Sequence, residues 1–471
     1  MGLMSKWRQQ EIIKYLKSAD PQKIMSEGEK KAIFAFQRAA YKIPAYRDII
    51  RKRGINYKSI TNIDAFKRLV PVIDKSIFSN AIDRLCVDGK IKDLKSIMLS
   101  SGFSNRFSYG ISSKKEIDSL IEFSDVLLEL NFKISRYTTF LISCLGMGVH
   151  VNTSLPIAET SVRSDIVVEL VKKIQDKYEQ IVILGNTYFM KKVLEQGVEK
   201  GIDWGEICVH IVVGEDWFPE NYRSYLSRML GVNLDDIDMR RGSMLSTLGI
   251  CELGLSLFQE SIDTVRIRRL ADANLRLKSA LFGKNTDVVP MLFHYNPFQI
   301  FLEECDGKLV FTTLNSDALM PLVRYSPGDN GVIIPYNKLK DVLSDFGMND
   351  YVPSLRLPLV AVKGREGKFI RIGEDIFTPE QVKTGIYSDA DTARATTGYF
   401  VMSKDPDNDN LKIEIQLKED RKDVFTMQGK FRDVIKRYIN TDNFNVVVYV
   451  YKEFPYGMGL TYEEKFRNIV V

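Results

Sequence analysis

Four short stretches of this sequence carry residue types that could bind a nucleotide and activate an acid. The first, residues 100–110, reads SSGFSNRFSYG and lies between a strand-like run and an expected helix. Its hydroxyls and backbone N–H groups could surround a phosphate, and an arginine would add positive charge. A serine-rich loop that caps the helix expected near Ser112 would explain the same residues. The candidate phosphate-binding residues are Ser100, Ser101, Gly102, Ser104 and Arg106.

Two further stretches each place one carboxylate in a tight turn. Residues 248–254 read LGICELG, with a glycine on either side of Glu252. Mg²⁺ prefers oxygen ligands, so this carboxylate could meet a metal-bound phosphate. Residues 324–331 read RYSPGDNG, and Asp329 on this turn could accept hydrogen bonds from two neighbouring ribose hydroxyls. Taken alone, a water-facing glutamate and an ordinary β-turn account for both stretches.

The fourth stretch, residues 364–382, reads GREGKFIRIGEDIFTPEQV and places Arg365 among glycines. An arginine at this point could reach a ribose or a phosphate. The glycines leave the backbone free to rotate, so residues 363–374 are a candidate hinge between two domains. A solvated charged loop is an equally good interpretation.

The elements around these stretches follow from the hydrophobic pattern, which changes along the chain. Helical spacing fills the first ~70 residues. Between Lys95 and Met239, strand-length apolar runs alternate with helical segments, which indicates β-α-β units and a largely parallel sheet. After Asp287, shorter strands separated by turns indicate an antiparallel or barrel-like subdomain. Beyond Arg365, the order strand, helix, strand, strand, helix, strand indicates a small α+β domain of ~100 residues.

The expected fold class is therefore α/β with two domains. Residues 1–365 would form a large N-terminal domain, with parallel-type sheets and the barrel-like subdomain, that binds nucleotide and acid. Residues 366–471 would form a small, mobile α+β domain.

Composition excludes several classes of protein. The chain has 471 residues, 45% of them hydrophobic, which rules out a collagen-like or wholly disordered chain. A net charge of +5 is too weak for a nucleic-acid-binding face. Five cysteines without CxxC spacing indicate neither a disulfide framework nor a zinc knuckle. The longest apolar stretch, residues 139–151, is too short to span a bilayer, and no secretory signal is evident, so we expect a cytoplasmic protein.

Taken together and in this order, the stretches resemble the adenylate-forming superfamily of acyl-CoA ligases, most closely its phenylacetate-CoA ligase-like branch. The resemblance covers nearly the whole chain. It includes VGEDWFPE at residues 213–220, LVFTTLNSDALMPLVRYSPGD at residues 309–329 and a C-terminal EEKFR. The run at residues 309–329 is the most specific of these.

The resemblance implies a role for each candidate residue. Asp329 would hold the ribose hydroxyls with support from Arg365, and Glu252 would hold Mg²⁺ that arrives with ATP. Lys465 would be the mobile C-terminal lysine, which with Mg²⁺ neutralises negative charge in the transition state. Gly214 and Glu215 would lie beside the adenine, with Gly249 bordering the nucleotide. The acid pocket would be lined by Met147, Gly148, Met244 and Leu248.

The implied reaction joins a small carboxylic acid to a thiol at the expense of ATP. The acid would form an acyl-adenylate and pyrophosphate, and the acyl group would then pass to coenzyme A. Transfer to an acyl carrier protein or to a protein cysteine is a close variant, which the sequence does not distinguish. The resemblance also suggests a homodimer.

Departures from the family pattern leave a second function open. Phe103 and Asn105 replace a hydroxyl residue and a glycine of the family's phosphate loop, and Gly367-Lys368 replaces an Asp-Asp pair at the hinge. A catalytically weakened nucleotide-binding regulatory or scaffold protein is therefore the alternative. His294 matches a metal ligand of some relatives, but the partner cysteines are missing, so no structural zinc is expected. His150 and His210 are interpreted as packing or surface residues.

Overall fold

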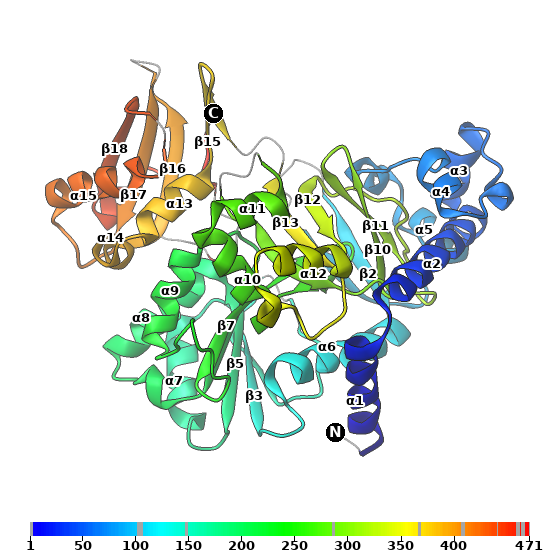
Figure 1. The fold of residues 1–471 in the computed structure, drawn as a ribbon, viewed down its shortest axis with the longest axis horizontal. Coiled ribbons are helices and arrows are strands. Elements are labelled where there is room, and N and C mark those ends of the chain that lie inside the picture. The colour runs from blue at the N-terminus through cyan, green and yellow to red at the C-terminus, as the bar shows by residue number, and fades with distance from the viewer. Residues whose placement is uncertain are drawn as a thin grey trace.

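The computed structural model describes most of the chain and is shown in Figure 1. The described residues are 3–100, 107–146, 149–284, 288–365, 369–406, 410–439, 441–457, 462 and 467–470. A three-stranded sheet with its helices lies at one end of the molecule, the N-terminal helices lie at the other, and a large sheet lies between them. None of the helices in these ranges is long and apolar enough to cross a membrane.

The N-terminal region is helical, as predicted from its apolar spacing. Asp20 caps the second helix by accepting the amide of Gln22 at 2.9 Å, and Pro21 occupies its first position. The buried face of that helix packs into a core shared with strands of the large sheet. The helices are α1 (Leu3–Ser18), α2 (Pro21–Lys42), α3 (Pro44–Lys52), α4 (Ile63–Leu69) and α5 (Ile82–Leu85).

A separate antiparallel hairpin follows, formed by β1 (Leu94–Leu99) and β2 (Tyr109–Ser113). It leads directly into α6 (Lys114–Phe132), which begins with a capping box: Ser113 Oγ accepts the amide of Glu116 at 3.2 Å. Since Ser113 supplies the cap, the serines of the preceding loop are not needed for that purpose.

The large sheet has eleven strands within the described residues, and one half is parallel, as predicted. Its inner strands are almost entirely buried, because helices pack on the sheet. The strands of this half are β3 (Thr139–Ser143), β4 (Ile157–Glu159), β5 (Gln180–Asn186), β6 (Val209–Gly214) and β7 (Gly242–Ile250). The helices between them are α7 (Ser164–Ile174), α8 (Thr187–Glu199) and α9 (Glu220–Met229).

The other half of the sheet is antiparallel, also as predicted, but within the described residues it continues the parallel half and does not form a separate barrel-like subdomain. β7 pairs parallel with β6 on one side and antiparallel with β8 on the other, so the two halves form one mixed sheet. The strands are β8 (Gly254–Gln259), β9 (Met291–Tyr295), β10 (Ile300–Cys305), β11 (Lys308–Thr313), β12 (Asp329–Ile334) and β13 (Leu359–Arg365). The helices are α10 (Ile262–Ala273), α11 (Leu275–Phe282) and α12 (Tyr336–Asp345).

The C-terminal region has the predicted order of strands and helices, with β15 and α14 added. β16 pairs antiparallel with β17, which pairs parallel with β18. Helix α13 packs against α9. The rings of Tyr387 and Tyr222 meet there edge to face, with their centroids 4.7 Å apart. The elements are β14 (Ile370–Ile372), β15 (Asp375–Phe377), α13 (Pro379–Tyr387), α14 (Ala390–Ala395), β16 (Thr396–Lys404), β17 (Leu411–Leu417), α15 (Val424–Lys436) and β18 (Phe444–Tyr449). The boundary at residues 365/366 stays a prediction.

Candidate active site

Asp329 and Arg365 form a cross-strand pair at the end of the large sheet. Asp329 is the first residue of β12 and Arg365 the last of β13, and the antiparallel register places them opposite one another. Arg365 Nε donates to Asp329 Oδ1 at 2.9 Å, and the Asp329 side chain is mostly buried. Burial by itself would lower the pKa of Arg365. The negative charge of the Asp329 carboxylate has the opposite effect and is stronger, so the pKa of Arg365 lies above its ordinary value. The pair is held in one orientation.

Glu252 lies close to this pair and is fixed by Tyr325. The Tyr325 hydroxyl donates to Glu252 Oε1 at 2.5 Å, and both residues are buried. Burial and then the Glu252 carboxylate raise the pKa of Tyr325, so the phenol stays protonated as a donor. Glu252 also contributes to the raised pKa of Arg365. The structure therefore brings together the carboxylates and the arginine that three separate stretches of sequence contributed.

Tyr325 is a site residue that the sequence analysis missed. It precedes Asp329 by four positions, within the stretch RYSPGDNG. Its backbone amide donates to the carbonyl of Phe311 at 2.8 Å, which ties it to the large sheet. A tyrosine before a Pro-Gly turn was the available signal, but only the fold shows that its hydroxyl meets Glu252.

The β1–β2 hairpin packs directly on the Glu252 loop. A Cβ at Gly110 would lie 2.1 Å from the carbonyl oxygen of Cys251 and 3.3 Å from Glu252 Cα, so only glycine fits there. The Cys251 thiol donates to the carbonyl of Met98 at 3.0 Å. The loop that joins the two strands, with most of the predicted phosphate-binding residues, therefore starts and ends beside this site.

Two residues at the base of that loop are described. Ser100 Oγ accepts the amide of Ser108 at 3.1 Å, and Ser100 N donates to the carbonyl of Ser108 at 3.0 Å, which closes the hairpin. Phe107 is 53% exposed, and its ring leans on Tyr109 with centroids 6.0 Å apart. Phe107 is therefore directed toward its hairpin neighbour and solvent. The role of Ser100 in phosphate binding stays a prediction.

Gly214 and Glu215 lie at the carboxyl end of β6, where ligands bind in α/β sheets. Glu215 has a left-handed backbone with φ 75°, which is unusual for a residue with a side chain. Asn186, at the end of the neighbouring β5, donates from Nδ2 to Glu215 Oε2 at 2.9 Å. This turn is thus held between the ends of two parallel strands, and its contact with an adenine stays a prediction.

A partly buried ion pair joins this turn to the C-terminal region. Lys383 on α13 donates from Nζ to Asp216 Oδ2 at 2.6 Å and to the carbonyl of Trp217 at 3.4 Å. The lysine side chain is only 3% exposed. Because Asp216 follows Glu215 directly, α13 is anchored beside the predicted nucleotide site.

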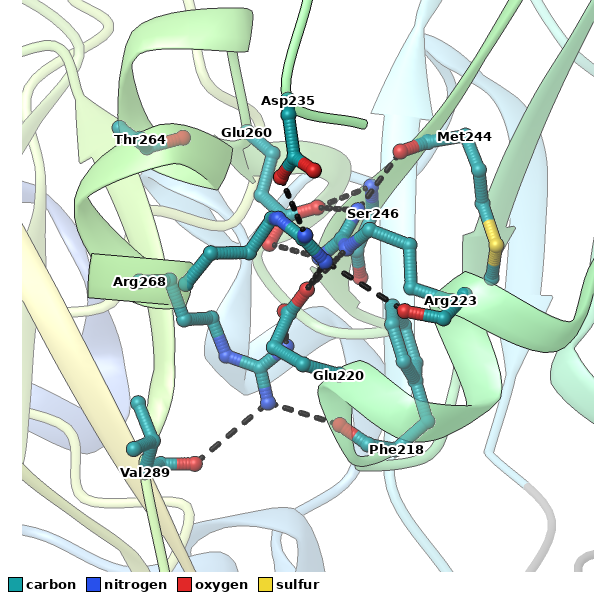
Figure 2. A network of polar contacts seen from close by, with 12 residues as sticks. Phe218, Glu220, Arg223, Asp235, Met244, Ser246, Glu260, Thr264, Arg268 and Val289 are labelled. Carbon is teal, nitrogen blue, oxygen red and sulfur yellow. Dashed lines mark hydrogen bonds and ion pairs between the residues drawn. The ribbon is translucent and has the colours of Figure 1, made fainter. Parts of the chain in front are cut away.

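The turn continues into a buried ionic network that Figure 2 shows in detail. Arg223 lies between Glu220 and Glu260 and donates hydrogen bonds to both. Its Nη2 donates to Glu260 Oε1 at 2.8 Å, and its Nε donates to Glu220 Oε2 at 2.9 Å. Arg268 also binds Glu220, and it donates to the carbonyl of Phe218 at 2.7 Å. Burial opposes ionisation of Glu220, but the two guanidinium groups outweigh it, so its pKa is lowered. The network fixes where the loop after β6 enters α9.

The predicted acid-pocket residues are only partly described. Met244 is buried in the core of the large sheet, at 2% exposure. Leu248 is half-buried and lies opposite Phe258 in the sheet. At Gly249 a Cβ would lie 2.6 Å from the carbonyl oxygen of Leu255, so close packing of β7 on β8 requires this glycine. The predicted residues outside the described ranges are Ser101, Gly102, Ser104, Arg106, Met147, Gly148 and Lys465.

His210 is a packing residue, as interpreted from the sequence. Its Nδ1 lies 2.9 Å from Ser243 Oγ and its Nε2 lies 3.1 Å from Gln180 Oε1. Burial lowers the pKa of His210 to about 3, so the ring is neutral. His150 lies at the surface, with Nδ1 2.8 Å from Glu159 Oε1.

Glu252 fits a Mg²⁺ ion that arrives with a nucleotide. Mg²⁺ keeps several waters and binds proteins through one or two carboxylates together with substrate phosphates. Tyr325 engages one oxygen of Glu252. Within the part of the chain that the structure describes, no group of three or more His, Cys, Asp or Glu residues could hold a metal by itself.

Comparison with solved structures identifies the architecture. No model of a known protein family matches this sequence, and no curated protein does. The structure is similar to 2-hydroxyisobutyryl-CoA ligase in the postadenylation state, with a TM-score of 0.67 at 10% identity over 94% of this chain and 90% of that one. The chain has the adenylate-forming ligase fold. The same ligase in its thioesterification state, bound to 2-HIB-AMP and CoA, has a TM-score of 0.54 at 11% identity with the same coverage.

Proposed function

We propose that this protein activates a carboxylic acid with ATP and transfers the acyl group to a thiol, most simply that of coenzyme A. The observation that carries the proposal is the meeting of Asp329, Arg365 and Glu252 at one end of the sheet. A single carboxylate can accept two ribose hydroxyls only if its orientation is fixed, and Arg365 fixes it. The second carboxylate lies close by, beside the hairpin that carries the predicted phosphate loop.

The reaction would proceed in two steps. The carboxylate oxygen of the acid attacks the α-phosphorus of ATP, the bond to the β-phosphate oxygen breaks, and pyrophosphate leaves. The thiolate then attacks the carbonyl carbon of the acyl-adenylate, and AMP leaves with the electron pair of the C–O bond. Mg²⁺ bound with ATP would neutralise phosphate charge. Asp329 would orient the ribose, Glu252 would retain the metal and Lys465 would neutralise charge on the reacting groups.

Coenzyme A is the preferred acceptor. The 2-hydroxyisobutyryl-CoA ligase of the same fold has been solved with CoA and an adenylate bound. An acyl carrier protein remains the variant that the sequence left open. Product formation with CoA, measured against a candidate carrier protein, distinguishes the two.

The small C-terminal domain, residues 366–471, would move between the two steps. The chain matches the postadenylation state of the similar ligase better than its thioesterification state, with TM-scores of 0.67 and 0.54. The Lys383–Asp216 ion pair crosses between the regions that would move. The ion pair would therefore form in only one of the two arrangements of the small domain.

Replacing Lys383 with methionine should slow adenylation about tenfold and leave thioester formation from added acyl-adenylate unchanged. A hydrogen bond to a charged group contributes about 1.5–3 kcal/mol, and it would be lost from only one arrangement. Single-turnover rates of the two half-reactions measure the effect. Lys430→Met is the matched control, because Lys430 pairs with Asp391 within the small domain. Equal slowing of both half-reactions would contradict the assignment.

Acid-dependent exchange of pyrophosphate into ATP tests the proposed function directly. Lys465→Ala should lower this exchange by about a hundredfold or more and leave ATP binding unchanged, because the lysine acts on charge that develops in the transition state. Calorimetry with ATP measures the binding. Nucleotide binding without exchange across a broad panel of acids would instead favour the catalytically weakened regulatory protein.

A further inference from the structure

The C-terminal tail contacts the large N-terminal region through the ring of Tyr462. This ring meets the ring of Phe189 on α8 edge to face, with the centroids 5.2 Å apart. Lys192 lies three positions after Phe189, on the same face of the helix. Its Nζ is 5.4 Å from the centre of the Tyr462 ring. Tyr462 therefore contacts both an aromatic ring and a positive charge on α8.

The contact belongs to the hydrophobic core. Phe189 is fully buried, and Tyr462 is half-buried and packs against the same core cluster. Burial raises the pKa of Tyr462 above its ordinary value, so the ring is neutral at physiological pH. An edge-to-face pair of rings and a cation over an aromatic ring each stabilise such a contact. The tail is thus fastened to α8 at this point.

The fastening point lies beside the predicted adenine turn. Phe189 is the third residue of α8, which follows directly on β5. Asn186, the last residue of β5, donates from Nδ2 to Glu215 in that turn at 2.9 Å. Its Oδ1 caps α8 by accepting the amide of Tyr188 at 2.9 Å. One side chain therefore links the end of the helix that holds Tyr462 to the candidate nucleotide site.

Lys465 lies midway along the chain between two fastening points. Tyr462 precedes it by three positions, and Asn468 follows it by three. Asn468 Nδ2 donates to the carbonyl of Phe400 at 3.0 Å, and its own carbonyl accepts the amide of Met402 at 2.8 Å, which ties the chain to β16. Three residues of chain span at most about 11 Å. The Cα of Lys465 is therefore within about 11 Å of both fastening points.

The two fastening points belong to regions that would move relative to one another. β16 is part of the small C-terminal sheet, whereas α8 packs on the large sheet. The same helix meets the small region twice more. Lys191 Nζ donates to the carbonyl of Thr396 at 2.8 Å, and Glu195 pairs with Lys418 at 2.9 Å. Rotation of the small domain would break these contacts, so Tyr462 would meet α8 in only one arrangement.

We propose that Tyr462 is a positioning residue, which docks on α8 during adenylation and so holds Lys465 beside the nucleotide. The proposal rests on the proposed function. A mobile lysine has to be ordered before it can stabilise the transition state, and a tail fastened on both sides of it is already ordered. When the small domain turns, Tyr462 would leave Phe189 and Lys192, and Lys465 would move away with it.

Replacing Tyr462 with alanine should slow formation of the acyl-adenylate about tenfold in a single turnover. Thioester formation from added acyl-adenylate should be unchanged. Tyr462→Phe keeps the ring and with it both contacts, so its adenylation rate should stay within about twofold of the native rate. Tyr456→Ala is the matched control and should slow neither half-reaction, because Tyr456 lies in the same segment but donates to Glu414 within the small region.

A double substitution separates positioning from a purely structural role. Tyr462→Ala combined with Lys465→Ala should be no slower than Lys465→Ala alone, because a residue that acts through the lysine has no effect once the lysine is gone. A residue needed only for folding would multiply the two losses. Multiplied losses, equal slowing of both half-reactions, or adenylation by Tyr462→Ala within about twofold of the native rate would overturn the inference while acid activation stands.

Tryptic cleavage after Lys465 tests the docking independently of the reaction. Mass spectrometry follows the loss of residues 466–471 from the full chain. Cleavage should be about tenfold faster in Tyr462→Ala than in the native protein or in Tyr462→Phe, because a fastened tail enters a protease less readily. Equal cleavage of all three proteins would contradict the docking. If no acid supports exchange by the native protein but cleavage differs as expected, the docking of Tyr462 stands and the proposed function falls.

Discussion

Asp329→Ala should lower acid-dependent pyrophosphate exchange by at least about a hundredfold. The substitution removes the acceptor expected to hold two ribose hydroxyls, and each hydrogen bond to a charged group contributes about 1.5–3 kcal/mol. Two such bonds together contribute about 3–6 kcal/mol. Each 1.4 kcal/mol corresponds to a change of about tenfold in rate or affinity. The loss should be visible both in exchange and in direct binding of AMP.

Two further variants make this experiment decisive. Asp329→Asn keeps the shape of the side chain and a carbonyl oxygen for Arg365, so it should fold and lose less activity. Asp341→Ala removes an exposed aspartate from α12 and should retain full activity. Exchange within threefold of the native rate in a folded Asp329→Ala protein would contradict the ribose-binding role, and with it the observation that carries the proposed function.

Glu260→Ala should destabilise the protein by about 3–5 kcal/mol. Glu260 is fully buried, and its carboxylate accepts from both Nη atoms of Arg223, at 2.8 and 3.0 Å, and from the amide of Ser246 at 2.7 Å. Removing it leaves the Arg223 guanidinium with one carboxylate partner and leaves a buried amide unsatisfied. Denaturant unfolding followed by circular dichroism measures the loss.

A surface glutamate on another strand provides the control for this second experiment. Glu304→Ala removes an exposed glutamate from β10, and its effect should stay within about 0.5 kcal/mol. A loss below about 1 kcal/mol in Glu260→Ala would mean that the network shown in Figure 2 contributes little to stability. The position of the loop after β6 would then need another explanation.

The helices and strands could be predicted from the sequence because each has a local cause. Apolar residues recur at helical spacing in α2, and Asp20 and Pro21 mark where that helix begins. Strand-length apolar runs identify β5 and β6, which are buried because helices cover them. That β7 joins the parallel and antiparallel halves into one sheet could not be predicted, since strand order depends on pairings between distant segments.

The sequence by itself determined which residues could do the chemistry, since turns that present Glu252, Asp329 and Arg365 are encoded within a few neighbouring positions. The tertiary structure alone decided which side chains meet in the candidate site and beside it. Tyr325 reaches Glu252 across 73 positions, and Lys383 reaches Asp216 across 167. Such contacts arise from strand register and packing, which act between segments distant along the chain, so no local pattern records them.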